Sequence, residues 1–165
     1  MSGIIGETGS KSGVIGVTNR GSLLPIWQSS RAGESAQHGS AQKITFEEDT
    51  TDNYFLNVGN CMNTSTDTFT CSLAGYYECQ FQSVGSGGTT QSDMSVSVKR
   101  NGTYVNCYGY CSGGDDQNND GGHHMHNNFF AIIKCNVGDT LEFWLTSSGF
   151  IMDGTLTGAY IKYLG

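Results

Sequence analysis

The sequence predicts an all-β domain, and three observations support this prediction. Glycine is abundant, with 24 of 165 residues, while only 14% of residues are charged and 11% are aromatic. A composition of this kind suits short strands that are joined by polar turns. Apolar residues recur at every second position in several segments, and turn-forming residues separate these segments. We therefore expect a sandwich or barrel of short strands.

The length of 165 residues fits one domain with an appendage, because two domains would each have too small a core. We place an N-terminal arm at residues 1–22 and the domain at residues 23–165. The arm contains a near repeat, Ser2–Gly6 and Ser12–Gly16, in which glycines flank two branched apolar residues. Two apolar residues do not offset the conformational entropy of ordering such a segment alone. The arm therefore either stays disordered or, as we favour, orders on a partner.

The first strand is expected between Leu23 and Gln28, where apolar residues gather around Pro25. Proline cannot donate a hydrogen bond to a sheet, so Pro25 favours an edge strand or the start of a strand. The polar stretch from Ser29 to Gln42 is interpreted as a long surface loop.

Beyond Lys43 the apolar residues alternate with polar ones, as half-buried strands require. The clearest segments are Tyr77–Phe81, Met94–Val98 and Leu141–Leu145. Among the turn signals, Asn101-Gly102 is the strongest, because both residue types tolerate the positive φ of a tight hairpin. No segment has the pattern of an amphipathic helix, so we expect strands throughout the domain.

Six cysteines are too few for a disulfide scaffold in a chain of this length. They lie at Cys61, Cys71, Cys79, Cys107, Cys111 and Cys135, which matches no familiar framework. We expect mostly free thiols that serve as small core side chains, with one or two bridges as the alternative.

The segment Phe69–Phe81 resembles the signature of the C1q domain, F-x5-G-x-Y-x-F-x-[FY]. Four of its five defined positions match, and Cys79 stands where the family prefers phenylalanine, which implies local repacking. Three further segments resemble the family: the hairpin Lys99–Gly102, the turn Asn136–Leu141 and the closing strand Gly154–Ile161.

This resemblance implies a ten-stranded jelly roll of the C1q/TNF type that assembles into a homotrimer. It places six residues in the core or the trimer interface: Tyr77, Phe81, Phe143, Tyr160, Ile161 and Tyr163. A jelly roll presents a wide sheet whose outer face needs cover. Tyr76, Trp144 and Tyr160 are out of phase with the core residues and would supply that cover.

The segment from Cys107 to His126 contains the residue types of a metal site. Zinc would use Cys107, Cys111, His123 and His126, but their spacing is not a standard one. Calcium near the trimer apex would resemble sites of the family, although the order of residues is not that of an EF-hand loop. The candidate ligands are Asp115, Asp116, Asp120, His123 and His126. We favour a solvated loop and expect no cofactor, with calcium as the alternative.

Several function classes are excluded by composition and motifs. The net charge of −7 disfavours binding to nucleic acid and to anionic membranes. No apolar run is long enough to span a membrane, and the N-terminus lacks the features of a secretory signal. Motifs such as GxSxG, HExxH and a phosphate-binding loop are absent, so we expect no enzymatic activity.

The arm resembles those that begin many structural proteins of marine tailed phages, and no collagen-like repeat precedes the domain, which disfavours immune roles. We therefore predict a non-enzymatic virion protein, assembled in the host cytoplasm, that decorates the capsid or forms the head of a fibre or spike. Four arm residues would bind the capsid or another virion protein: Ile4, Ile5, Val14 and Ile15. The head could in addition adhere to a host-surface glycan.

The alternative function is a secreted C1q-like lectin or another ligand-binding module. Such a protein would contact its partner through the loops Gly85–Ser92 and Gly113–His126. Oxidised cysteines would favour this alternative, whereas free thiols favour assembly inside a cell.

Overall fold

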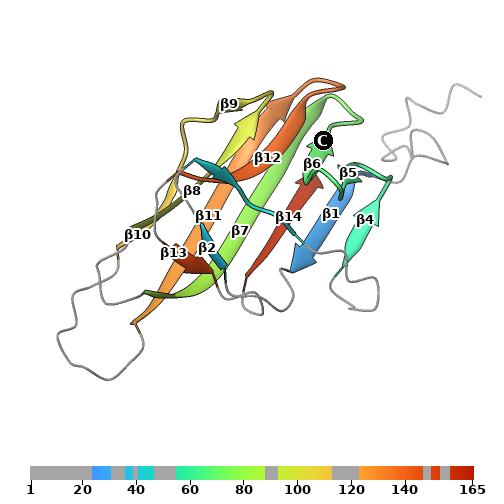
Figure 1. The fold of residues 1–165 in the computed structure, drawn as a ribbon. Helices are drawn as coiled ribbons and strands as arrows, with labels where there is room; N and C mark the ends of the chain where they lie inside the picture. Colours follow the sequence, from blue (N-terminus) through green and yellow to red (C-terminus); the bar gives the residue numbers. More distant parts are fainter. Residues whose placement is uncertain are drawn as a thin grey trace, which may run out of the picture.

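The computed structural model describes residues 24–30, 36–38, 41–46, 55–87, 93–112, 123–146, 150–152 and 157–165. These residues form fourteen strands in two antiparallel sheets that pack as two layers, which confirms the all-β prediction (Figure 1). None of the described residues is helical, so this part of the chain contains no helix that could cross a membrane. The predicted arm, residues 1–22, lies outside the described residues.

Sheet A contains the two longest strands. Its strands are hydrogen-bonded in the order β2–β13–β7–β14–β1–β4, and β11 pairs with β7 along its whole length. The bounds are β1 Ile26–Ser30, β2 Ala36–His38, β4 Leu56–Val58, β7 Gly75–Gly87, β11 His123–Cys135, β13 Phe150–Met152 and β14 Gly158–Tyr163. Both β13 and β14 pair with β7, β13 at Gly85 and β14 from Tyr77 to Gln82.

Sheet B lies on the other side of the core and has the order β10–β8–β12–β6–β5, with β3 beside β12 and β9 beside β8. The bounds are β3 Gln42–Lys43, β5 Met62–Asn63, β6 Thr68–Thr70, β8 Asp93–Arg100, β9 Thr103–Tyr104, β10 Gly109–Ser112 and β12 Thr140–Leu145.

The strands are more numerous than the ten that the resemblance implied. Seven of the fourteen have four residues or more, and the other seven have two or three. Strand β1 continues to Ser30, into the stretch that we interpreted as a loop, so that interpretation was wrong there. It was also wrong at two of the short strands, β2, which lies inside the stretch, and β3, which begins at its last residue, Gln42. Both form through pairing with distant strands, β13 and β12, rather than through an apolar pattern of their own.

The core lies between the sheets and is rich in aromatic residues. Its largest fully buried side chains are Trp27, Tyr77, Phe69, Phe81, Phe129, Phe143, Ile44, Leu141 and Leu145. Cys79, where the C1q signature has phenylalanine, is also fully buried. Phe46 packs edge-on against Trp27, with ring centroids 4.9 Å apart. The side chains that the alternation of apolar and polar residues predicted to face inward on β7, β8 and β12 are therefore found in the core.

One predicted turn and one predicted strand start are confirmed. Asn101 and Gly102 have φ values of 51° and 78°, and they connect β8 to β9 in a hairpin that pairs Arg100 with Thr103. Pro25 immediately precedes β1, which is hydrogen-bonded to β14 and β4 on its two sides. Pro25 therefore marks a strand start, one of the two positions that its missing N–H allows.

Candidate self-association surface on sheet A

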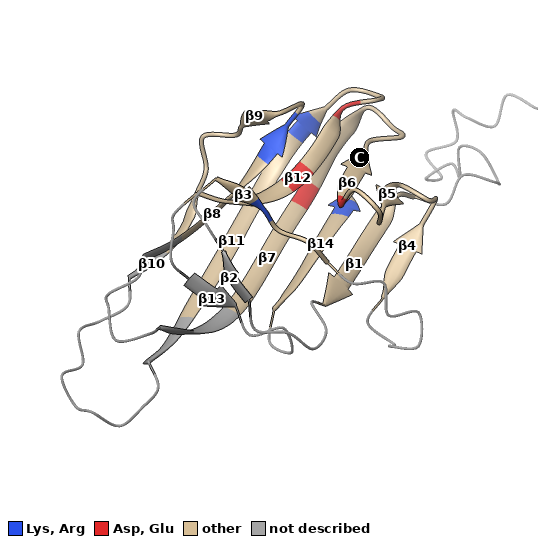
Figure 2. Ribbon diagram, viewed as in Figure 1, with Lys and Arg blue, Asp and Glu red and all other residues tan. Residues whose placement is uncertain are grey.

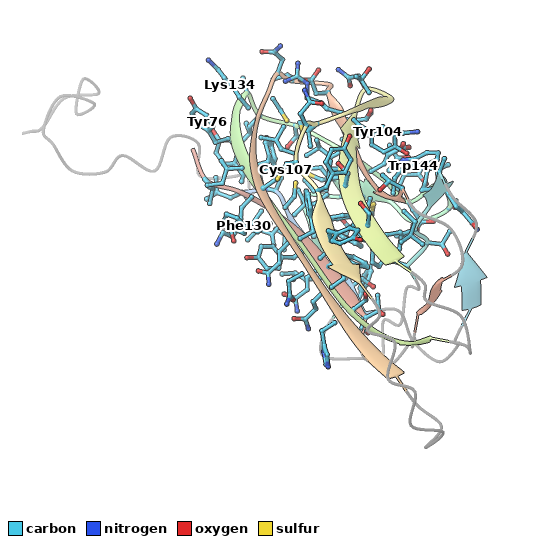
Figure 3. The ribbon with its side chains drawn as sticks, turned by 90° about the vertical axis from the view of Figure 1, so that its left-hand side faces the viewer. Tyr76, Tyr104, Cys107, Phe130, Lys134 and Trp144 are labelled. Carbon is cyan, nitrogen blue, oxygen red and sulfur yellow. The ribbon has the colours of Figure 1, made fainter. Side chains whose placement is uncertain are left out.

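The outer face of sheet A carries large apolar side chains that face solvent. Tyr76 of β7 is 49% exposed, Phe130 and Ile132 of β11 are each 55% exposed, and Leu164 after β14 is 45% exposed. Figure 3 shows Tyr76, Phe130 and Lys134 projecting from the same side of the molecule. We call Tyr76, Phe130, Ile132 and Leu164 the sheet A patch.

Strand register places these side chains in neighbouring rows. Tyr76 lies opposite Lys134, and the backbone N–H of Leu164 donates to the Tyr76 carbonyl at 2.8 Å. Ile132 lies opposite Glu78, and Phe130 lies opposite Gln80. The apolar groups of the patch therefore border a small polar centre on β7 and β14 on two sides, along β11 and at the end where Tyr76 and Leu164 lie.

The charge and the hydrogen-bonding groups of that polar centre are paired within the chain. The Tyr160 hydroxyl donates a hydrogen bond to the Glu78 carboxylate, and the Lys162 ammonium lies 3.8 Å from the other carboxylate oxygen. Burial, together with the neighbouring Glu78, raises the pKa of Tyr160 to about 12, so its hydroxyl stays a donor at neutral pH. Removing such a paired carboxylate from water costs less free energy than removing an isolated one.

Strand β11 contributes to both faces of the sheet because its apolar residues do not alternate with polar ones. Phe129, Ala131 and Ile133 point into the core, while Phe130 and Ile132 point outward. The sequence analysis did not identify these two outward residues. The signal that could have found them is the continuous apolar run from Phe129 to Ile133, which is typical of a strand covered on both faces.

Next to β11, the segment that leads into β10 and the first residue of β10 pack against that strand. The Cys107 thiol lies 3.6 Å from the Phe130 carbonyl oxygen, which accepts its hydrogen bond. Gly109 approaches β11 so closely that a Cβ there would lie 2.7 Å from the Asn128 carbonyl oxygen. This contact holds β10 against β11 and thereby supports the strand that presents Phe130 and Ile132.

The outer face of sheet B has a different character, with a polar network around one tryptophan. The Lys99 ammonium lies 3.3 Å from the Trp144 ring centroid and 4.6 Å from that of Tyr104. Glu142 accepts hydrogen bonds from Trp144 Nε1 at 3.0 Å and from Lys43 Nζ at 2.5 Å. Figure 2 shows that charged positions are otherwise sparse along the strands.

The structure separates the six residues predicted for the core or the trimer interface. Tyr77, Phe81, Phe143 and Ile161 are buried in the core. Tyr163 packs against that core, with its ring centroid 5.2 Å from that of Tyr77.

Tyr160 alone among the six lies on an outer face, beside Glu78. Tyr76 shares this face, as expected. Trp144 does not, because it belongs to β12 of sheet B, so the prediction that it covers the same sheet face as Tyr76 and Tyr160 was wrong.

Of the five candidate metal ligands, the structure describes His123 and His126. His126 is exposed on β11, and His123 begins that strand, so neither lies in the loop where we expected it. Asp115, Asp116 and Asp120 lie outside the described residues. Within the part of the chain that the structure describes, no three histidine, cysteine or acidic side chains are arranged to hold a metal ion. The arm residues Ile4, Ile5, Val14 and Ile15 also lie outside it.

Comparison with known proteins identifies the fold. No protein-family model matches the sequence, and no curated protein matches it. Among solved structures, the globular domain of the zebrafish complement 1qA protein is similar, with a TM-score of 0.59 and 16% sequence identity. The match covers 85% of this chain and 96% of that one. The chain has a C1q-like fold. In this C1q-like fold, the segment that resembles the family signature forms β6, the following turn and the first half of β7.

Proposed function

We propose that this chain is a non-enzymatic module of the C1q type that assembles into a homotrimer through the sheet A patch. The observation that carries the proposal is that four large apolar side chains are exposed on one sheet face, next to the Glu78 carboxylate. The charge of this carboxylate is already paired within the chain, with Tyr160 and Lys162. Soluble monomers rarely leave contiguous apolar surface of this kind in water. The similarity of the fold to a C1q globular domain supports the same proposal.

A ring of three copies requires two different surfaces that meet at each interface. In the arrangement that we propose, Phe130 and Ile132 on β11 of one copy pack against the face formed by β7 and β14 of the next. Glu78, Tyr160 and Lys162 would then lie near the centre of the ring. Their mutual hydrogen bond and ion pair would limit the cost of removing them from water.

The test compares two matched pairs of substitutions by light scattering at micromolar concentration. Tyr76→Ser with Phe130→Ser removes two exposed rings from sheet A, and Tyr108→Ser with Tyr110→Ser removes two exposed rings from β10 and the loop before it. We expect the unmodified chain and the second variant to be trimers and the first variant to be a folded monomer by circular dichroism. A trimeric first variant would exclude the sheet A patch, and a monomeric unmodified chain would exclude the homotrimer.

We further propose that the trimer is a virion protein, a capsid decoration or the head of a fibre or spike, made in the host cytoplasm. This part rests on the sequence of the arm, whose glycine-flanked apolar pairs suit docking on another protein. The experiment compares two proteins, the full chain and a chain that begins at Leu23, for binding to purified virions or capsids. Binding by the full chain alone supports an anchoring arm, and equal binding, or binding by neither, excludes it.

A secreted ligand-binding module is the second candidate, and exposed tyrosines favour it. Tyr108, just before β10, is 51% exposed, and Tyr110, on β10, is 63% exposed. The Tyr108 ring lies 6.4 Å from that of Tyr104. Exposed tyrosines offer an apolar ring and a hydroxyl together, which suits contact with a partner that has both apolar and polar groups, such as a glycan. The measurement is binding to an array of host-surface glycans. Specific binding that is lost in the Tyr108→Ser and Tyr110→Ser variant supports this role, and absence of binding excludes it for those glycans.

A further inference from the structure

Cys71 and Cys135 belong to the buried core and lie next to the connection between β11 and β12, which Figure 1 shows at one end of the sandwich. Cys71 directly follows β6 of sheet B, and Cys135 is the last residue of β11 in sheet A. Both side chains are buried, with 0% and 2% exposure, and both thiols are free. We propose that these two cysteines are the site of an intrachain disulfide that links the two sheets under oxidising conditions.

Backbone hydrogen bonds hold the two cysteines in place. The Cys71 N–H donates to the Asp139 carbonyl at 2.8 Å, and the Gly138 N–H donates to the Cys71 carbonyl at 2.8 Å. Gly138 and Asp139 belong to the turn that follows Cys135, and the Asp139 N–H donates to the Asn136 carbonyl within that turn. Cys71 is therefore hydrogen-bonded to the turn that directly follows Cys135, and we expect a bridge to need rotation of side chains rather than rearrangement of strands.

Each of the two thiols shifts the pKa of the other. The hydrogen bond with Cys135 and burial raise the pKa of Cys71, whereas the same hydrogen bond lowers the pKa of Cys135. Cys135 is therefore the thiol that ionises first, and the thiolate is the form that attacks a disulfide. The opposite pKa shifts of the two thiols support the Cys71–Cys135 bridge that the backbone hydrogen bonds indicate.

Strand register excludes a bridge between Cys135 and Cys79, the other buried cysteine of sheet A. Cys79 lies opposite Ala131, whereas Cys135 lies opposite Gly75, four residues farther along β7. At about 3.3 Å for each residue of a strand, this offset exceeds the Cα separation that a disulfide spans, which is about 7 Å at most. Cys61 is the other buried cysteine near Cys71, and its thiol contacts the Gly59 carbonyl and the Ser72 hydroxyl, so the experiment must distinguish the Cys61–Cys71 bridge from the proposed one.

The reaction with oxidised glutathione is balanced as two successive exchanges. The Cys135 thiolate attacks one sulfur of glutathione disulfide and releases one glutathione thiolate, which gives a mixed disulfide. The Cys71 thiol loses its proton and attacks the Cys135 sulfur, which releases the second glutathione. The two cysteines lose two electrons and two protons in total, and two molecules of reduced glutathione form. Because both thiols are buried, the exchange takes place during folding or local opening of the chain.

The experiment refolds the full chain in a glutathione redox buffer and maps disulfides in a chymotryptic digest without reduction. Aromatic cleavage sites at Phe69 and Tyr76 separate Cys71 from Cys61 and Cys79, so the linked peptide is unambiguous. We expect the Cys71–Cys135 peptide and a melting temperature roughly 10 °C above that of the reduced chain, because the bridge closes a long loop. The Cys79→Ala variant should still form this bridge, whereas Cys71→Ala and Cys135→Ala should show no increase on oxidation.

Three outcomes would overturn the inference. These are a dominant bridge that involves Cys61, Cys79 or Cys107, the absence of any linked peptide under oxidising refolding, and a bridge that lowers the melting temperature. The inference is independent of the proposed trimer, since the bridge lies inside one chain and is measured whether or not the chain assembles.

Discussion

The Lys99 ammonium lies directly over the Trp144 ring, 3.3 Å from its centroid, and reaches the Tyr104 ring at 4.6 Å. Lys99 belongs to β8 and Trp144 to the adjacent strand β12, so the contact crosses two hydrogen-bonded strands on the outer face of sheet B. A cation over an aromatic face contributes about 0.5–1 kcal/mol at a partly exposed site. The contact therefore stabilises the pairing of β8 and β12 from outside the core.

Replacing Lys99 tests this contact. We expect Lys99→Met to lower the free energy of unfolding by about 0.5–1 kcal/mol, measured by chemical denaturation. Lys99→Arg should retain most of the stability, because a guanidinium also stacks on aromatic rings. A double-mutant cycle with Trp144→Leu measures the coupling, and a coupling near zero would show that the two side chains are merely adjacent.

The close approach of β10 to β11 predicts that Gly109 does not tolerate a side chain. A Cβ at this position would lie 2.7 Å from the Asn128 carbonyl oxygen and 2.9 Å from Phe129 Cβ. We expect Gly109→Ala to lower the free energy of unfolding by about 1–3 kcal/mol, because backbone atoms must shift.

Gly158 of β14 provides the matched control for this substitution. A Cβ there would meet only the Ser29 carbonyl oxygen, at an ordinary 3.5 Å. Gly158→Ala should change the stability by less than about 0.5 kcal/mol. Equal losses in the two variants would mean that the β10–β11 contact is not the cause.

The sequence predicted those parts of the fold that local chemistry determines. Alternation placed Tyr77 and Phe81 in the core because successive residues of a strand face opposite sides. The tight turn at Asn101-Gly102 was predictable because positive φ is tolerated by few residue types. Both conclusions needed only residues that are close in sequence.

The errors concern features that depend on distant partners. Period two shows on which side of its strand Trp144 lies, but not to which sheet that strand belongs. Strand β2 has no apolar pattern and forms only because β13 pairs with it. Phe130 and Ile132 were missed because their strand is apolar on both faces, so alternation gave no sign of an outward-facing pair.

The Asn101 side chain joins the β8–β9 hairpin to the turn before β12. Its amide donates to an Asp139 carboxylate oxygen at 2.7 Å, and its carbonyl accepts from the Thr140 N–H at 2.8 Å. Asn101→Gly removes these bonds but tolerates the φ of 51°, whereas Asn101→Ala loses both the bonds and the favourable φ. We expect losses of about 1–2 kcal/mol for glycine and about 1 kcal/mol more for alanine in thermal unfolding. Alanine as stable as glycine would contradict a role for the backbone conformation.

Glu142 predicts an acid-sensitive contribution to stability. Burial opposes its ionisation, but hydrogen bonds from Lys43, Trp144 and Thr68 outweigh this effect and lower its pKa below the usual 4.5. A carboxyl group with a lowered folded-state pKa stabilises the protein above its unfolded-state pKa and loses this contribution as the pH falls through the folded-state value. We expect Glu142→Gln to cost about 1–2 kcal/mol at pH 7.

The pH dependence distinguishes this electrostatic role from lost packing. The difference in the free energy of unfolding between the unmodified chain and Glu142→Gln should shrink steadily below pH 4.5 and vanish once the carboxyl is protonated in both states. Lys43→Met removes the ammonium that lies 2.5 Å from Glu142. This variant should show a weaker dependence of the free energy of unfolding on pH in the acidic range. Chemical denaturation at a series of pH values between 7 and 3 measures all three proteins. Parallel curves for the unmodified chain and Glu142→Gln would mean that the carboxylate contributes through its shape and not through its charge.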